Sequence, residues 1–490
     1  MGPDVNWANE LRAILPELLL TGYAFLLVIC AALFPREWRR WVGYLALLCS
    51  GITLLLVIKT WVVLPPEGVY AFGGMFSLDQ FSLFFKVVFL AGAILTILLS
   101  LRFLDLEGER VGEYYALILF ATVGMMFMAS ARDLVMVFVS LETMSLSSYL
   151  LVGYLQRDRQ SNEAALKYFI LGALSSGIFA YGMSLVYGAT GTTDLEAIAA
   201  VAMAGGGGAL LALGMVLMMV ALGFKVAAAP FHMWVPDAYQ GAPSPITAFI
   251  STASKAAAFA IFARIFAQAF QPLEERWTLL LALLSLVSMT VGNVGAIVQE
   301  NMKRMLAYSS IAHAGYALMA IVAIGRGDEI GAFGLTALVI YMLVYTFMNM
   351  GAFGFVVMLR RENVVGDRVA DFAGMAARAP LAAAAMLVLL LSLAGIPATA
   401  GFIGKWYLFG AAIRADFTWL AVAAVINSAI SLYYYVRVVV YMYMREPGSE
   451  ERYSASPFLL GALAVSLLFT VGFGLYPEPL IHLARAAVMH

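Results

Sequence analysis

Long apolar runs follow one another along the chain, and short polar stretches separate them. A helix needs about 20 mostly apolar residues to cross the hydrocarbon core of a bilayer, and fourteen runs reach about that length. We therefore predict an all-α integral membrane fold with about 14 transmembrane helices. The predicted spans are residues 11–34, 41–64, 77–101, 113–130, 134–155, 162–189, 209–239, 245–270, 278–298, 302–324, 330–359, 380–413, 417–444 and 457–476.

The seventh and twelfth predicted spans, 209–239 and 380–413, are too long for one straight crossing. The seventh contains Pro230 and Pro236, and the twelfth contains Pro397, each with glycines nearby. Proline inside a helix removes a backbone hydrogen bond and clashes with the preceding turn. The sequence therefore predicts discontinuous helices at these two places, with breaks at Pro230 and Pro397.

The two broken spans are five spans apart. If spans four to eight form one unit and spans nine to thirteen form another, each unit crosses the membrane an odd number of times, so the second copy is inverted. Inverted repeats with a broken helix in each half are typical of transporters. We predict helices 1–3 at residues 1–111, the first repeat at 112–272, the second at 273–446, and helix 14 with a tail at 447–490.

Composition agrees with a membrane protein. Hydrophobic residues make up 63% of the chain and charged residues 12%, against about 45–50% and 25% in soluble domains. The net charge of -1 provides no basic surface for nucleic acid. Cys30 and Cys49 have no histidine or cysteine at metal-binding spacing, and no dinucleotide or haem motif occurs. We expect no metal, cofactor-binding site or redox group in this chain.

Basic residues predict the orientation. Connections after odd-numbered spans carry fifteen of them and the opposite side carries six; because basic loops stay in the cytoplasm, both termini are expected outside. The first group is Arg36, Arg39, Arg40, Arg102, Arg110, Arg157, Arg159, Lys303, Arg304, Arg360, Arg361, Arg368, Arg378, Arg445 and Arg452, and the second is Arg12, Arg132, Arg276, Arg326, Arg414 and Arg485.

Lysines interrupt the apolar spans, whereas arginines lie mostly at their ends. A lysine in a low-dielectric site can exchange its proton near neutral pH, but an arginine cannot. The lysines inside spans are Lys86, Lys167, Lys225, Lys255 and Lys405. This distribution indicates protonation chemistry within the membrane.

Glu142 is interpreted as the only acidic residue deep inside a span, at a depth similar to that of Lys225. A Glu142–Lys225 ion pair is therefore predicted. Lys255 and Lys405 are candidates to receive the proton next, and His232, beside the break, is a candidate bridge because its ordinary pKa is near neutral.

Structural interpretations remain open for several of these residues. The central lysines and Glu142 can instead be ion pairs between helices, and Lys167 lies near enough to a span end to extend to the membrane surface. Lys86, two turns after Asp79, is expected to form a structural pair with it. His313 is compatible with a helix–helix hydrogen bond as well as with a proton path. The 433–435 tyrosines are expected to pack against lipid and core.

Three motifs resemble a known family. They are 225–239 (KVAAAPFHMWVPDAY), 299–310 (QENMKRMLAYSS) and 395–405 (GIPATAGFIGK). Together they are similar to the antiporter-like membrane subunits of respiratory complex I. That resemblance implies fourteen helices in two inverted five-helix repeats, and it assigns proton-translocating positions to Glu142, Lys167, Lys225, Lys255 and Lys405. Tyr308, within the second motif, and His313, just beyond it, are possible auxiliary residues.

The N-type branch of the family fits best. The M-type branch usually has a glutamate where this chain has Lys405, and the L-type branch continues into a long lateral helix. The resemblance implies a multi-pass protein of the bacterial inner membrane whose partners are other membrane and peripheral subunits, including other antiporter-like ones. NADH, flavin, iron–sulfur clusters and quinone are expected in those partners. The alternatives are a subunit of an Mrp-type sodium/proton antiporter or membrane-bound hydrogenase, a stand-alone carrier, or a structural anchor.

Overall fold

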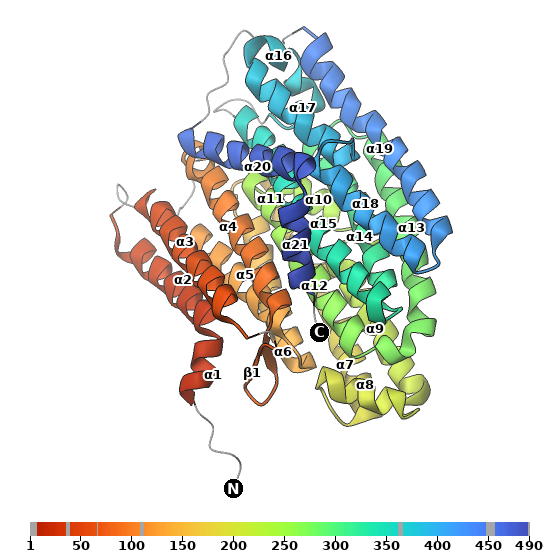
Figure 1. Cartoon of the computed structure of the whole chain (residues 1–490). Helices are drawn as coiled ribbons and strands as arrows, with labels where there is room; N and C mark the ends of the chain where they lie inside the picture. Colours follow the sequence, from red (N-terminus) through yellow and green to blue (C-terminus); the bar gives the residue numbers. More distant parts are fainter. Residues whose placement is uncertain are drawn as a thin grey trace.

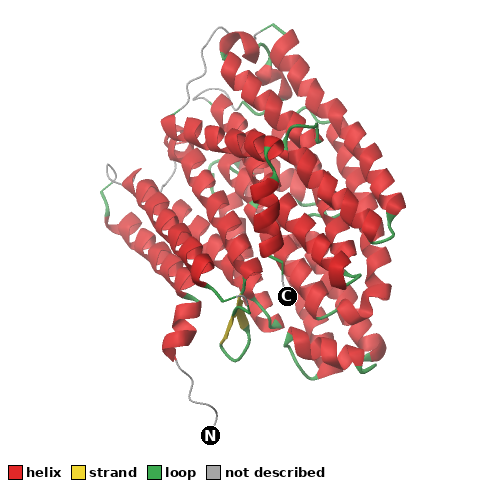
Figure 2. Ribbon diagram, viewed as in Figure 1, coloured by secondary structure: helices red, strands yellow, loops and turns green. Residues whose placement is uncertain are grey.

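The computed structural model of the chain describes residues 7–35, 40–65, 67–107, 112–360, 366–446 and 456–488. Helices make up most of this part, and one short β-hairpin is its only sheet (Figure 2). The terminal residues Met1 and His490 lie outside the described residues, as do these arginines of the predicted basic connections: Arg36, Arg39, Arg110, Arg361 and Arg452.

The first three spans form one side of the molecule (Figure 1). They follow the short helix α1 (Trp7–Ala13), and they are α2 (Leu15–Leu33), α3 (Arg40–Val63) and α4 (Gln80–Glu107). Between α3 and α4 the strands β1 (Val69–Ala71) and β2 (Phe76–Leu78) pair antiparallel, with Tyr70 opposite Ser77. The hairpin therefore lies beside α1, at the end of the bundle where α2 begins (Figure 1).

The next five spans form the first repeat, and two of them are interrupted. They are α5 (Gly112–Ser130), α6 (Leu134–Val152), α7 (Arg159–Thr190), α9 (Gly208–Val226) with α10 (Val235–Gly241), and α11 (Ser244–Ser251) with α12 (Ala253–Gln268). A short helix, α8 (Leu195–Met203), connects α7 to α9.

Five further spans form the second repeat. They are α13 (Glu274–Ile297), α14 (Met302–Ile324), α15 (Asp328–Leu359), α17 (Pro380–Ala394) with α18 (Ala400–Arg414), and α19 (Thr418–Met444). The short elements η2 (Gln271–Leu273), η3 (Val369–Phe372) and α16 (Met375–Arg378) lie in the connections. The fourth member is broken in both repeats, and the odd number of crossings inverts one repeat relative to the other, as predicted.

The last span, α20 (Pro457–Leu475), lies across α4, α15 and α18 (Figure 1). It is followed by α21 (Glu478–Ala486), which returns alongside α15. Among the described residues, 13 helices are long and apolar enough to cross a membrane, and α17 is a shorter apolar helix. Together with α18 it supplies the remaining crossing, so the prediction of about 14 transmembrane helices is confirmed.

Small residues bring α13 and α14 into close contact at the centre of the second repeat. A Cβ added at Gly292 would lie 2.4 Å from the backbone nitrogen of Ala312, and one added at Gly315 would lie 2.6 Å from that of Met289. In a bilayer, small residues allow backbones to approach and gain van der Waals contact. Because α14 is packed so tightly, the polar side chains that it carries are held in defined positions.

Two sequence interpretations about buried charge were wrong. Lys86 does not pair with Asp79; its Nζ lies 2.7 Å from the Glu17 carboxylate of α2, and both side chains are fully buried. Glu142 is therefore not the only acid deep inside a span, since Glu17 is another. Asp79 instead lies 2.8 Å from Arg264 of α12. Its carboxylate also accepts from the Ser82 backbone nitrogen at 2.7 Å, so Asp79 is directed to the start of α4 rather than along it.

The Glu17–Lys86 pair generates a prediction about stability. Lys86→Met should destabilise the protein by about 3–5 kcal/mol, because it leaves a buried carboxylate without its counter-charge. The double variant Glu17→Leu/Lys86→Met should recover most of that loss. Thermal unfolding of the purified protein and its yield in membranes measure both effects. Equal stability of the single and double variants would show that the two charges do not depend on each other.

Candidate functional site

The break in the seventh span is closed by its own backbone and by two side chains. At the end of α9, Ala228 donates to the Gly223 carbonyl at 2.8 Å and Ala227 donates to the Phe224 carbonyl at 3.1 Å. This pair of hydrogen bonds is the Schellman motif, which satisfies carbonyls at a helix end. Ala227 takes the left-handed conformation, with φ 67°, where glycine is more usual. The helix therefore stops directly after Lys225 and Val226.

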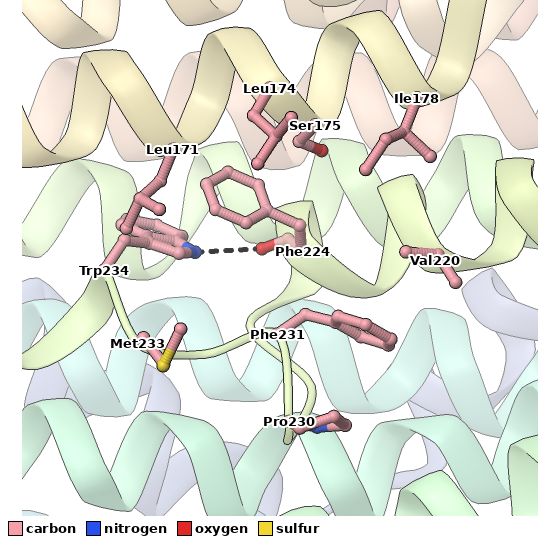
Figure 3. A pocket seen from close by; sticks show the side chains of 10 residues that line it. All are labelled: Leu171, Leu174, Ser175, Ile178, Val220, Phe224, Pro230, Phe231, Met233 and Trp234. Atoms are coloured by element: carbon pink, nitrogen blue, oxygen red, sulfur yellow. Dashed lines mark hydrogen bonds between the residues drawn. The ribbon is translucent and has the colours of Figure 1, made fainter. Parts of the chain in front are cut away.

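Side chains complete the hydrogen bonds of this break. The Trp234 indole donates to the Phe224 carbonyl at 3.0 Å (Figure 3), and the backbone nitrogen of Ala229 donates to Ser288 Oγ at 2.8 Å. Pro230 lies in the irregular segment between α9 and α10, as the sequence predicted. A segment without helical hydrogen bonds is tolerated at this depth because the protein satisfies its polar groups.

An apolar cavity of about 150 Å³ adjoins the break. Figure 3 shows the side chains around it, among them Leu174, Phe224, Pro230, Phe231 and Met233. Buried water needs two to four polar partners, and these side chains offer almost none. The cavity is therefore unsuited to a chain of ordered water molecules.

Lys225 lies in the last turn of α9 and is 7% exposed. Its ammonium donates to Ser145 Oγ at 2.7 Å and to Tyr149 OH at 3.4 Å. Glu142 accepts a hydrogen bond from Ser176 of α7. These contacts give Lys225 two hydroxyl partners on α6 and give Glu142 a partner on the neighbouring helix.

The predicted Glu142–Lys225 ion pair is absent among the described residues, because no oxygen of Glu142 lies within 4.0 Å of Lys225. Glu142, Ser145 and Tyr149 are spaced three and four residues apart, so they share one face of α6. Lys225 reaches that face one turn beyond the carboxylate. The two charges therefore have separate hydrogen-bond partners instead of a direct contact.

The eighth span carries a break that the sequence did not predict. Its two parts, α11 and α12, meet at Thr252, with φ −118° and ψ −80°. Asn349 of α15 donates to Ser251 Oγ at 2.8 Å beside this break. Lys255 follows in the first turn of α12, and its ammonium donates to the Ser310 carbonyl at 2.6 Å and hydroxyl at 2.5 Å.

Ser310 connects Lys255 to hydroxyl groups of both repeats. Its oxygen accepts from Tyr345 OH at 3.0 Å, and Tyr239 OH lies 3.4 Å away. One turn further along α14, His313 is fully enclosed between Tyr341 OH and Tyr435 OH, the latter at 3.2 Å from Nε2. A histidine ring bonded at both nitrogens can accept a proton on one side and release it on the other.

Lys405 lies in α18 but reaches back across the break of the twelfth span. Its ammonium donates to the Ala394 carbonyl at the end of α17, at 2.8 Å, and to Ser428 Oγ of α19, at 2.9 Å. Gly395 makes this possible: its φ is 89°, and an added Cβ would lie 2.8 Å from Lys405 Cδ. Pro397 lies in the same irregular segment, where the sequence predicted the break.

Three candidate residues lie apart from these contacts. His232 is half-buried, and its Nδ1 has no hydrogen-bond partner among the described residues. Lys167 is about half exposed and lies 2.8 Å from both Glu163 and Asp237. Tyr308 packs its ring against Gly295 of α13. None of the three makes a direct hydrogen bond to Lys225, Lys255 or Lys405 in the part of the chain that the structure describes.

The hydroxyl partners were the residues that the sequence interpretation missed. They include Ser145, Tyr149, Ser310, Tyr345 and Tyr435. A signal was present for the first two, because Glu142, Ser145 and Tyr149 recur at helical spacing, and for Ser310, which is three residues before His313. Tyr435 had no such signal, since it lies in a run of three tyrosines.

The polar groups form four separate clusters, around Lys225, Lys255, His313 and Lys405. No direct hydrogen bond connects one cluster to the next among the described residues, so proton transfer between them requires water or a change of side-chain position. Nor do the described residues contain a group of three or more His, Cys, Asp or Glu side chains that could hold a metal ion. The arrangement suits the movement of protons.

Comparison with known proteins places the chain in a family. A family model described as "NADH:quinone oxidoreductase/Mrp antiporter, TM" matches residues 131–431. NADH-quinone oxidoreductase subunit N 1 of Koribacter versatilis is 45% identical over 99% of this chain and 96% of its own length.

Solved structures give the same result. A chain of respiratory complex I from Thermus thermophilus has 35% sequence identity and a TM-score of 0.80, with 96% of this chain and 99% of that chain covered. A chain of the Mrp complex from a Dietzia species has 24% identity and a TM-score of 0.82, over 97% of both chains, and shares the fold. The chain therefore belongs to the NADH:quinone oxidoreductase/Mrp antiporter family and, within it, to the subunit N group of NADH-quinone oxidoreductase.

Proposed function

We propose that this chain is a proton-translocating membrane subunit of a bacterial NADH:quinone oxidoreductase. The observation that supports this most directly is that three lysines lie buried at helix breaks, each hydrogen-bonded to hydroxyl or carbonyl groups. The redox reaction belongs to partner subunits, which hold the NADH site, flavin, iron–sulfur clusters and quinone. This chain takes part in the reaction as one subunit of a translocase and carries the protons.

The first step uses Lys225 and Glu142. Ser145, one turn after Glu142 on α6, accepts from the Lys225 ammonium, and its hydroxyl can turn to donate to the amine once the proton has left. The carboxylate stabilises the protonated form of Lys225 by an amount that depends on their separation. A displacement that takes Glu142, with its Ser176 partner, further from Lys225 weakens that stabilisation and favours release of the proton.

The second step carries the proton into the second repeat. Lys255 already donates to Ser310 of α14, and His313 lies one turn along the same helix. From there Tyr435 and Ser309, 2.5 Å apart, extend the hydroxyl cluster toward α19, which carries the Ser428 partner of Lys405. These contacts favour His313, rather than His232, as the residue that passes the proton from Lys255 toward Lys405. His232 lies at the side of the break.

Lys167 is proposed to position α10. Its ion pair with Asp237 is shared with Arg304 of α14, at 2.7 Å, so three helices meet at one carboxylate. Fixing α10 in this way sets the geometry of the polar segment between Pro230 and Trp234. Lys167 thereby affects the proton path through its structure, without carrying the proton.

The partners are proposed to be the other membrane and peripheral subunits of the complex, including other antiporter-like subunits, within the lipid bilayer. The divisions at 1–111, 112–272, 273–446 and 447–490 are proposed as its structural units. The excess of basic residues after odd-numbered spans supports periplasmic termini.

The second candidate function is that of a subunit of an Mrp-type antiporter or a membrane-bound hydrogenase, since a chain of the Mrp complex shares the fold. Co-purification of flavin and iron–sulfur subunits distinguishes the candidates.

Lys225→Ala should reduce proton pumping by the assembled complex at least tenfold, because it removes the group that takes up the proton. Glu142→Ala should give a similar loss, since the carboxylate sets the proton affinity of Lys225. The measurement is NADH-driven quinone reduction together with proton uptake in proteoliposomes. Lys59→Ala, at an exposed lysine of α3, is the matched control and should pump normally. Normal pumping by both Lys225→Ala and Glu142→Ala in a fully assembled complex would contradict the proposal.

The two histidines can be separated by their effects on turnover. His313→Ala should slow pumping severalfold more than His232→Ala, because only His313 lies among hydrogen-bonded hydroxyl groups beside Lys255. Tyr435→Phe removes one hydroxyl partner of His313 with little change in volume and should give an intermediate loss. Coupled turnover measured across a range of pH reports all three. If His232→Ala slows pumping more than His313→Ala, then His232, at the seventh-span break, passes the proton and the proposed role of His313 is wrong.

Orientation can be tested by cysteine labelling after Cys30 and Cys49 are replaced with serine. Glu67→Cys, beside the β-hairpin, should react with a membrane-impermeant maleimide in intact spheroplasts. Arg157→Cys, in the connection between α6 and α7, should react only after the membrane is permeabilised. Both positions are exposed, so their access differs by side alone. Reaction of Arg157→Cys in intact spheroplasts, with Glu67→Cys protected, would reverse the proposed orientation.

A further inference from the structure

A groove of about 600 Å³ runs along the outer face of α19 near its C-terminal end. Its walls include Tyr433, Val436, Arg437, Val440, Tyr441 and Arg445. The groove contains none of the lysines or histidines of the candidate proton path. It is therefore a separate feature of the surface that faces the bilayer.

The groove is charged at one end and apolar along the rest of its length. Arg437 is held in place by the carbonyls of α13 and its following turn, donating to Ile297 at 2.6 Å and to Gln299. Arg445 is exposed at the mouth, with its guanidinium 5.8 Å from the centre of the Tyr441 ring. Toward the middle of α19 the lining changes to Val436, with Leu432 and Ala429 beyond it.

The position of the charges matches the membrane surface. Arg445 directly follows Met444, the last residue of α19, and Arg437 lies eight residues before Arg445, which is about 12 Å along a helix at 1.5 Å per residue. Headgroups lie at the ends of spans, and basic pockets on the cytoplasmic side attract anionic lipids. Arg445 belongs to the connections that carry the excess of basic residues.

We propose that this groove binds an anionic phospholipid. The phosphate contacts the exposed guanidinium of Arg445, with Arg437 as a second fixed positive charge beneath it, and an acyl chain lies along Val440, Val436 and Leu432. Tyr441 covers the glycerol region between them. Two guanidinium groups favour a lipid with net negative charge over a zwitterionic one, even though Glu446 follows Arg445 in the chain.

The test uses the assembled complex in vesicles that contain photoactivatable phosphatidylglycerol or photoactivatable phosphatidylcholine with the same acyl chains. Cross-linked peptides are mapped by mass spectrometry. Phosphatidylglycerol should label the segment 429–445 in preference to phosphatidylcholine. Arg445→Gln should reduce that labelling about fivefold, the effect of losing one basic contact at a membrane surface, and Arg445→Lys should retain most of it because the charge remains.

The matched control is Arg159→Gln, which removes an exposed arginine at the start of α7 and should leave labelling of 429–445 unchanged. Assembly and turnover of each variant show whether the complex has stayed intact. Equal labelling by the two lipids, or labelling unaffected by Arg445→Gln, would overturn the proposal. So would an absence of label on 429–445 from either lipid in the assembled complex, because the groove would then be covered by another subunit.

Discussion

The cost of placing an ammonium group in a medium of low dielectric constant governs this structure. A charged side chain at the centre of a bilayer costs at least about 2.5–3.5 kcal/mol, so each buried lysine must have polar partners. The chain supplies them in three ways. Hydroxyl groups contact Lys225 and Lys255, and a carboxylate contacts Lys86. Backbone carbonyls accept from Lys405 and from Lys303, which donates to Ala242 at 2.7 Å. A regular helix uses its carbonyls internally, so the carbonyls of Ala242 and Ala394 are free to accept because each lies where a helix ends; the Ser310 carbonyl, inside α14, is the exception that Lys255 contacts.

The helix α14 connects the two repeats chemically as well as mechanically. It belongs to the second repeat, yet its Ser310 receives Lys255 of the first, and its first-turn residues Lys303 and Arg304 hold α10. A packed connection of this kind can carry a change in one half to the proton affinity of the other. The close approach of α13 at Gly292 and Gly315 holds α14 in place.

The helix breaks and buried charges could be predicted because each depends on a single residue with a strong local effect. Pro230, Pro397 and the lysines needed no knowledge of their neighbours. Pairing was different, because it depends on how each helix is rotated and how far a side chain reaches. The sequence spacing places Lys86 and Asp79 on one helical face. In the structure, Lys86 forms an ion pair with Glu17 of α2, and Asp79 forms one with Arg264.

The same reasoning explains the other misses. The break at Thr252 contains no proline or glycine and follows from tertiary contacts such as that of Asn349 with Ser251. In the run of three tyrosines, Tyr433 faces outward with 61% of its surface exposed, whereas Tyr435 is fully buried against His313 and Ser309. Identical residues therefore differ in burial because of how the helix is rotated, and the sequence alone does not specify that rotation.

The interrupted seventh and twelfth spans place their lysines at the same kind of electrostatic site. Lys225 occupies the last turn of α9, and Lys405 reaches back to the last carbonyls of α17. Each cation therefore lies at the negative pole of a half-helix macrodipole, where the aligned peptide groups act as roughly half an elementary charge. Rewinding or extending either break would move that pole relative to the ammonium. The backbone can thus change the charge preference of a lysine while every ionisable side chain stays where it is.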